Sequence, residues 1–213
     1  MKKLIFLLVV IVFNLSAKAQ NAEYLKTMQE TLGQFSSVQS VADMQALGNK
    51  FQMIANVEKG EWLPLYYHAE CYILMSFMEQ SDAAKKDNYL DVAEKSITKL
   101  IEMAPNEAEV FALQGFYLTG RLVVNPMERG QEYSGRVQQA LGKALAIDPA
   151  NPRAQMLKIQ MDMNSAPYMG LDAKSFCPKA KELLAKWDDF KPKSSIYPTW
   201  GKDQVEQIVK GCE

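Results

Sequence analysis

The stretch LGKALAIDPANPRA, residues 141–154, decides the fold, because an apolar helix stops at Asp148-Pro149 and a second helix restarts after Pro152. Residues 97–108, ITKLIEMAPNEA, show the same pattern when they are moved forward by 44 positions. A third copy, LAKWDDFKP at residues 184–192, places its proline 43 positions after Pro149. Recurrence at a fixed period is typical of proteins built from stacked helix pairs. The sequence therefore predicts a helical repeat scaffold.

The first 19 residues have the composition of a secretory signal peptide. A basic start precedes an apolar run at residues 4–15, and the AKA at residues 17–19 has the small-x-small pattern that signal peptidase cleaves. The run is too short for a membrane-spanning helix, and no later stretch approaches the roughly 20 apolar residues that one needs. We expect cleavage before Gln20 and a periplasmic or secreted mature protein with no membrane span.

Charge and composition exclude nucleic acid as a partner. Removal of the signal peptide takes away three lysines and no acidic residue, so the formal net charge changes from −1 to −4. A weakly acidic chain without a Lys/Arg cluster lacks the electrostatic footprint of phosphate-backbone binding. With 48% hydrophobic and 23% charged residues, the chain has the composition of a folded domain.

The three cysteines bear on both compartment and fold. Cys71 lies in an apolar run, where a cysteine usually behaves as a small buried hydrophobe. Cys177 and Cys212 lie at the edges of predicted helices near the C-terminus, and we expect them to form a disulfide in an exported protein. The alternative is three free thiols.

Hydrophobic periodicity predicts helices and no strands. Apolar residues step by three or four through residues 41–54, with Ser40 as N-cap, and residues 62–78 are apolar on almost every side. Gly115, inside another helical stretch, is expected to let a neighbouring helix approach closely. Three stretches rich in polar or turn-forming residues are interpreted as long loops, at residues 79–88, 121–130 and 164–175.

Each recurring unit resembles the tetratricopeptide repeat, two antiparallel helices of which the second is closed by a proline. Gly115 and Ala69 occupy the small-residue position of the first helix. The spacing in the second helix matches at Ala93, Ile97, Leu100 and Pro105; at Val137, Leu141, Ala144 and Pro149; and at Ala180, Leu184, Trp187 and Pro192. HEAT-type repeats have periods near 40–47 residues, but the proline-closed turn favours the tetratricopeptide family.

The resemblance implies an all-α fold, a right-handed stack of antiparallel helix pairs that forms a tetratricopeptide-like α-solenoid. Because the unit exceeds the family's 34 residues, we place the extra length in lengthened loops inside each pair. The expected organisation is a signal peptide, N-terminal capping helices, the repeats and a C-terminal capping segment, at residues 1–19, 20–60, 61–192 and 193–213. The motifs NPMERG and PTWG also resemble those of small exported proteins of this family.

Candidate chemistry is sparse. His68, the single histidine, shares a helix face with Cys71, but a packed histidine with one hydrogen bond is the preferred interpretation over a thiol–imidazole pair. Four methionines raise the idea of a soft-metal site, and core packing is the better account of them: Met156, Met161, Met163 and Met169. We therefore expect a protein that is not an enzyme, with no catalytic residue, metal or cofactor.

The remaining candidate is the concave groove that the first helix of each unit lines in the resembled family. The residues that this register implies are mostly apolar or aromatic and lack a basic clamp for a peptide carboxylate. They are Tyr66, Glu70, Ile73, Ala112, Phe116, Thr119, Met156, Gln160 and Met163.

Three functions are consistent with this sequence. The first is an exported scaffold that binds an unidentified protein or peptide of the cell envelope. The second is an enzyme or small-molecule carrier that uses the long loops as a pocket. The third is a structural module whose groove is filled by its own N-terminal helix, residues 22–35.

Overall fold

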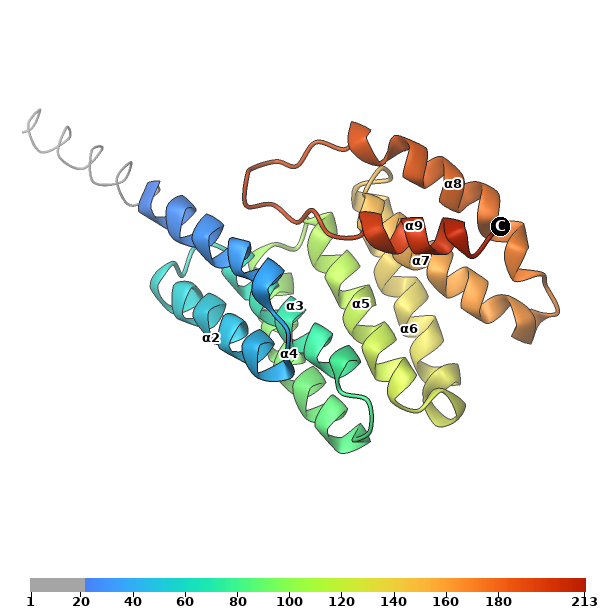
Figure 1. Ribbon diagram of the computed structural model, residues 1–213, viewed down its shortest axis with the longest axis horizontal. Helices are drawn as coiled ribbons and strands as arrows, with labels where there is room; N and C mark the ends of the chain where they lie inside the picture. The colour runs from blue at the N-terminus through green and yellow to red at the C-terminus, as the bar shows by residue number, and fades with distance from the viewer. Residues whose placement is uncertain (1–21) are drawn as a thin grey trace, which may run out of the picture.

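The computed structural model describes residues 22–213, and this part of the chain consists of helices and turns without a strand. The helices follow one another as a stack from the N-terminal helix to α9 (Figure 1). The predicted all-α, solenoid-like fold is confirmed. No helix within these residues combines the length and hydropathy that crossing a bilayer requires. The expected signal peptide and its cleavage site lie outside the described residues.

The first half of the stack is built around one buried helix. A helix at residues 22–33 leads through the 3-10 turn η1 (Gln34–Ser37) to α2 (Val41–Val57) and α3 (Leu63–Met78). The Ser40 side chain caps α2 by accepting a hydrogen bond from the backbone of Asp43, as predicted. Because α3 packs against α2, α4 and α5, almost its whole circumference is buried.

The middle of the stack corrects the prediction of long loops inside the helix pairs. The helices here are α4 (Ala83–Met103), α5 (Ala108–Val124) and α6 (Pro126–Ile147). Residues 83–88 and nearly all of residues 121–130 are therefore helical, and a single residue, Asn125, separates α5 from α6. Pro126 starts α6 in the first helical turn, where the missing amide costs no hydrogen bond. In the α3–α4 and α5–α6 pairs the extra length therefore lies in the helices.

An ionic cluster accounts for the helical state of the predicted loop at residues 121–130. The guanidinium of Arg121 on α5 donates hydrogen bonds to Asp87 at 2.8 Å and to Asp91, both on α4. Arg129 on α6 donates to the same Asp87 carboxylate at 2.7 Å through both terminal nitrogens. Three helices are thus joined by charged side chains that a sequence pattern assigns to solvent.

The organising turn connects α6 to α7 (Pro152–Ser165). Asn151 caps α7 by accepting a hydrogen bond from the backbone of Ala154 at 2.8 Å. Gly115 also has the predicted use: a Cβ at this position would lie 2.8 Å from Cγ of Leu141, so α5 and α6 approach closely because the side chain is absent.

The C-terminal part turns back over the stack. After α7, the 3-10 turns η2 (Ala166–Met169) and η3 (Ala173–Phe176) make up the connection predicted at residues 164–175. The last elements are α8 (Cys177–Lys186), η4 (Trp187–Asp189) and α9 (Lys202–Lys210). The predicted disulfide joins Cys177 to Cys212, while Cys71 is buried and free. Residues 190–201, here named the C-terminal strap, run without regular structure from η4 back toward α3 and α5 (Figure 1).

Candidate functional site

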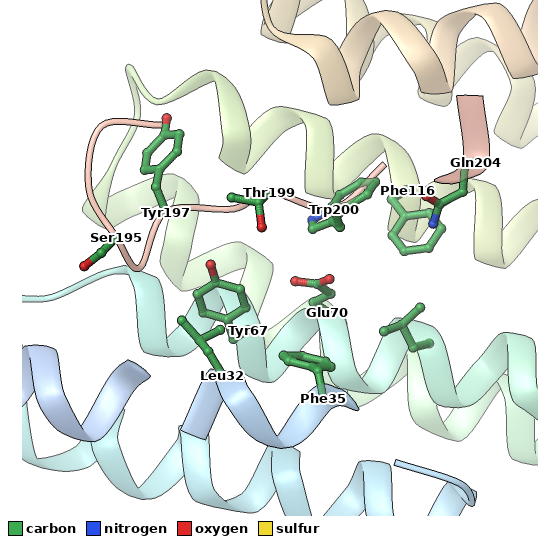
Figure 2. Close-up of a pocket in the computed structure, with 11 residues that line it drawn as sticks. Leu32, Phe35, Tyr67, Glu70, Phe116, Ser195, Tyr197, Thr199, Trp200 and Gln204 are labelled. Atoms are coloured by element: carbon green, nitrogen blue, oxygen red, sulfur yellow. The ribbon is translucent and has the colours of Figure 1, made fainter. Parts of the chain in front are cut away.

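A pocket of about 430 Å³ lies between the C-terminal strap and residues 22–37, here named the N-terminal segment (Figure 2). Helix α3 also lines it. Tyr67, Glu70 and Leu74 line it from α3, where their spacing of three and four residues places them on one face of the helix. Leu32, from the helix at residues 22–33, and Phe35, from η1, line the side of the pocket that faces the strap. Phe116 of α5 and five residues near the C-terminus complete the lining, namely Ser195, Tyr197, Thr199, Trp200 and Gln204.

Aromatic contacts fix the apolar lining. The ring of Phe116 lies 5.4 Å from that of Trp200, and it also stacks on Phe77 at 5.2 Å between ring centroids. On the other side, Phe35 lies 6.3 Å from Tyr67. Rings at these separations contribute both buried area and favourable edge or offset contacts. The pocket is therefore preformed by rigid, largely apolar side chains.

Hydrogen bonds from α3 hold the C-terminal strap over the pocket. The hydroxyl of Tyr67 donates to the carbonyl oxygen of Ile196 at 2.8 Å. The indole nitrogen of Trp200 donates to the hydroxyl oxygen of Tyr66 at 2.9 Å. Both contacts join residues more than a hundred positions apart, so the lining of the pocket exists only in the folded chain.

A second set of contacts anchors the strap near the start of α5. Tyr197 and Lys193 donate to the two carboxylate oxygens of Glu107 at 2.6 and 2.8 Å. The strap ends at Gly201, whose φ of 114° lies in the region that favours glycine. A Cβ there would also lie 2.7 Å from the ring of Trp187. The position of Trp200 thus depends on a glycine directly after it.

The electrostatics of the pocket depend on Glu70. Its side chain is buried, and its Oε2 atom has no hydrogen-bond partner among the described residues. Burial raises the pKa of this carboxyl to about 8, although Arg153 acts in the opposite direction. The described lining residues include no lysine, arginine or histidine. The pocket therefore combines apolar walls with one carboxyl group that is largely protonated at pH 7.

The groove predicted from the tetratricopeptide register corresponds to this pocket at two positions, Glu70 and Phe116. Tyr66 lies behind the lining and holds Trp200. Ile73, Ala112 and Met156 are buried in the core, and Met163 is packed against it. Thr119 donates to the carbonyl oxygen of Gly115 within α5, and Gln160 is exposed. The predicted surface is therefore mostly interior.

Sequence reasoning missed the strap, whereas the alternative in which residues 22–35 occupy the groove anticipated a contribution from the N-terminal side. The helix at residues 22–33 and η1 supply Leu32 and Phe35 to one side, but a pocket remains between them and the strap. The sequence feature that could have predicted the strap side of the pocket is the segment PTWG, which begins with a proline and carries the aromatic residue Trp200. Tyr67 and Leu74 could have been found from their helical spacing relative to Glu70.

The other chemical candidates lie apart from the pocket lining. His68 Nδ1 is 2.8 Å from the Ser96 hydroxyl of α4, and burial lowers the pKa of this histidine to about 4. Burial raises the pKa of the Cys71 thiol, which disfavours the thiolate that a nucleophile needs. Residues 22–213 hold no cluster of His, Cys, Asp and Glu side chains suited to a metal ion.

The four methionines do not form a shared site. Met156 and Met161 are buried in the core, and Met163 packs against it. Met169, at the end of η2, is exposed instead. This arrangement fits core packing for the first three residues and gives no set of sulfur atoms that faces the pocket.

Comparisons with known proteins bear on this pocket. Neither protein-family models nor curated proteins match the chain. Among solved structures, the chain is similar to the HusA haemophore from Porphyromonas gingivalis, with a TM-score of 0.78 and 27% sequence identity. The similarity covers 89% of this chain and 92% of the haemophore. Both this likeness and the Cys177–Cys212 disulfide fit an exported binding protein.

Proposed function

We propose that this chain is an exported, non-enzymatic binding protein whose pocket takes a flat, largely apolar ligand of the porphyrin class, with haem as the first ligand to test. The observation that carries the proposal is the aromatic pocket between the N-terminal segment and the strap, in a fold similar to that of a haemophore. The chain acts in the periplasm or outside the cell.

The shape and lining of the pocket support a flat ligand. Its volume of about 430 Å³ falls within the range of roughly 300–1,000 Å³ that small-molecule sites occupy. Trp200 and Phe116 offer ring surfaces on one side, and Phe35 lies across from Trp200 (Figure 2). A macrocycle inserted edge-on between these sides buries both of its faces against apolar carbon.

The described lining contains no histidine, cysteine or methionine that could bind iron axially. Its two tyrosines, Tyr67 and Tyr197, donate their hydroxyl groups to Ile196 and Glu107. Stacking and apolar burial are therefore the sources of affinity, and the ligand is held as cargo. An iron-free porphyrin binds for the same reason.

A small ligand fits better than the envelope protein or peptide expected from the sequence. The strap already lies along α3 and α5, where a peptide would dock in an open helical groove. The pairs α3–α4 and α5–α6 are, in this proposal, tetratricopeptide-like units whose concave side has been adapted to hold the strap and a ligand.

Haem titration of the wild-type chain tests the proposal, with the Soret absorbance and the quenching of tryptophan fluorescence as readouts. Phe116→Ala removes one ring from the pocket, and we expect the affinity to fall about tenfold. Tyr168→Ala is the matched control, because this aromatic residue on η2 is 87% exposed and outside the pocket lining. Circular dichroism melting verifies that both variants are folded. Absence of a Soret shift in the wild-type chain, or equal affinity of Phe116→Ala and Tyr168→Ala, contradicts the proposal.

A further inference from the structure

Glu70 is the one carboxyl group among the described lining residues, and no charged group satisfies it. Its side chain is 6% exposed and points into the pocket between Phe35 and Trp200 (Figure 2). Its Oε2 atom has no hydrogen-bond partner within the described chain. A buried polar atom that is left unpaired destabilises the folded chain, so a ligand group that pairs with it gains affinity.

The charged groups around Glu70 do not neutralise it. Arg153 of α7 is committed to Glu109 of α5, with hydrogen bonds of 2.5 and 2.6 Å, so its charge is already balanced. On α3 itself, Tyr66 and Tyr67 are buried, and desolvation raises the pKa of both phenols. Burial also raises the pKa of the Tyr197 phenol in the strap. None of these tyrosines ionises near neutral pH.

The protonation state of Glu70 decides which ligand group it can pair with. Because burial raises the pKa of its carboxyl to about 8, the group is a neutral acid at pH 7 and can donate one O–H hydrogen bond. A hydrogen bond from an O–H to an ionised oxygen is short and roughly twice as strong as a neutral one. The complementary ligand group is therefore an acceptor, and a carboxylate is the strongest acceptor of this kind.

We propose that the carboxyl O–H of Glu70 donates a hydrogen bond to a carboxylate of the ligand. The pocket thereby selects flat apolar molecules that carry an acidic side chain. This inference rests on the proposed function, since natural porphyrins carry such carboxylates at the edge of the ring. Glu70 lies between Phe35 and Trp200 (Figure 2), so in this proposal a ring inserted edge-on between these two side chains brings its edge to Glu70.

Proton linkage gives this contact a characteristic pH dependence. Ionised Glu70 has no proton to donate and repels a second carboxylate in a poorly solvated pocket. Binding therefore requires the protonated form, and affinity falls as the pH rises through the pKa of Glu70. With a pKa of about 8, the loss between pH 6.5 and 9.5 amounts to roughly 30-fold.

Mesoporphyrin IX, an iron-free porphyrin dicarboxylic acid, is the probe, because ferric haem takes up hydroxide in the same pH range. We expect the wild-type affinity to fall by about 30-fold between pH 6.5 and 9.5. Glu70→Gln retains a neutral donor of similar size and is expected to bind with nearly the same affinity across this range. Glu70→Leu lacks the donor and is expected to bind about tenfold more weakly than Glu70→Gln at pH 6.5. Phe116→Ala is the control, with weaker binding at every pH and the wild-type pH profile.

Each contrary result has a distinct meaning. The same pH profile in wild type and Glu70→Gln overturns the inference, as does an affinity that rises with pH, which would indicate a cationic ligand group paired with ionised Glu70. Binding of haem without binding of mesoporphyrin IX overturns it as well, together with the account of affinity by stacking and apolar burial alone, while the proposal of a haem-binding pocket stands. Failure of the wild-type chain to bind either compound at any pH overturns both.

Discussion

The guanidinium of Arg153 donates two hydrogen bonds to the carboxylate of Glu109, 44 residues earlier in the chain, and neither side chain has exposed surface. Asn151, the cap of α7, donates to the same carboxylate at 2.5 Å. Arg153 Nη1 also lies 3.5 Å from the carbonyl oxygen of Trp200. One buried ion pair therefore connects α5, the organising turn and the strap that closes the pocket.

Removal of one partner of this pair is expected to destabilise the fold severely. Glu109→Gln leaves the Arg153 charge buried without a counter-ion, which costs about 3–5 kcal/mol of unfolding free energy. Urea denaturation followed by circular dichroism measures the change. Glu182→Gln breaks the exposed pair with Lys186 and serves as the control, with an expected midpoint equal to that of the wild type. Equal midpoints for the two variants would contradict this account of the buried pair.

Two glycines inside helices provide a matched pair for the packing between α5 and α6. Gly115→Ala places a Cβ against Leu141, and we expect a loss of about 1–3 kcal/mol from overpacking. Gly142 lies in the interior of α6 with no atom near its hypothetical Cβ, so Gly142→Ala should add about 0.5–1 kcal/mol through helix propensity. Thermal melting shows the difference as shifts of opposite sign. A gain in stability for both variants would show that the contact between Gly115 and Leu141 accommodates an added Cβ, contrary to this expectation.

The sequence predicted the elements whose apolar faces are wide. The helical period at residues 41–54 and the continuous apolar run at residues 62–78 correspond to α2 and α3, and the DPANP turn separates α6 from α7. The first turns of α4 were missed because residues 83–89 have no fully buried side chain there. Their polar surface has the composition of a loop, although Asp82 caps a helix at that point.

The pocket was harder to predict than the helices because its parts are distant in sequence. Two of the residues expected from the family register, Glu70 and Phe116, line the pocket, and each lies on a helix whose phase is set by hydrophobic periodicity. The strap has no periodicity, and its place over α3 is decided by single hydrogen bonds such as that from Trp200 to Tyr66. Arg121 shows the same difficulty, because its partners lie on another helix.

The disulfide is expected to affect both stability and ligand binding. Cys177 and Cys212 are separated by 35 residues, and closing a loop of this length restricts the unfolded chain by about 3–4 kcal/mol in the entropic model. Because α9 and the strap lie inside this loop, reduction also frees the side of the pocket that carries Trp200 and Gln204. We expect dithiothreitol to lower the melting temperature and to weaken haem binding in the wild-type chain.

The variant that replaces both Cys177 and Cys212 with Ser controls for other effects of the reductant. Dithiothreitol should not change its melting temperature or its haem affinity further, since Cys71 is already free. Mass spectrometry after alkylation without reduction gives an independent measure, with Cys71 as the one thiol available in the unfolded chain. Alkylation of all three cysteines would contradict the disulfide.

His68 gives the fold a stability that depends on acid pH. Burial lowers the pKa of this histidine from 6.5 to about 4, so the unfolded chain binds a proton more readily than the folded chain between these values. The stabilising contribution is complete above pH 6.5 and is lost as the pH falls toward 4. Between pH 7 and pH 4.5 this one group should lower the unfolding free energy by about 2 kcal/mol. His68→Gln, which keeps a polar partner for Ser96 but does not titrate, is expected to lose less stability over the same interval in urea denaturation. An equal loss in wild type and variant would show that other groups carry the acid sensitivity.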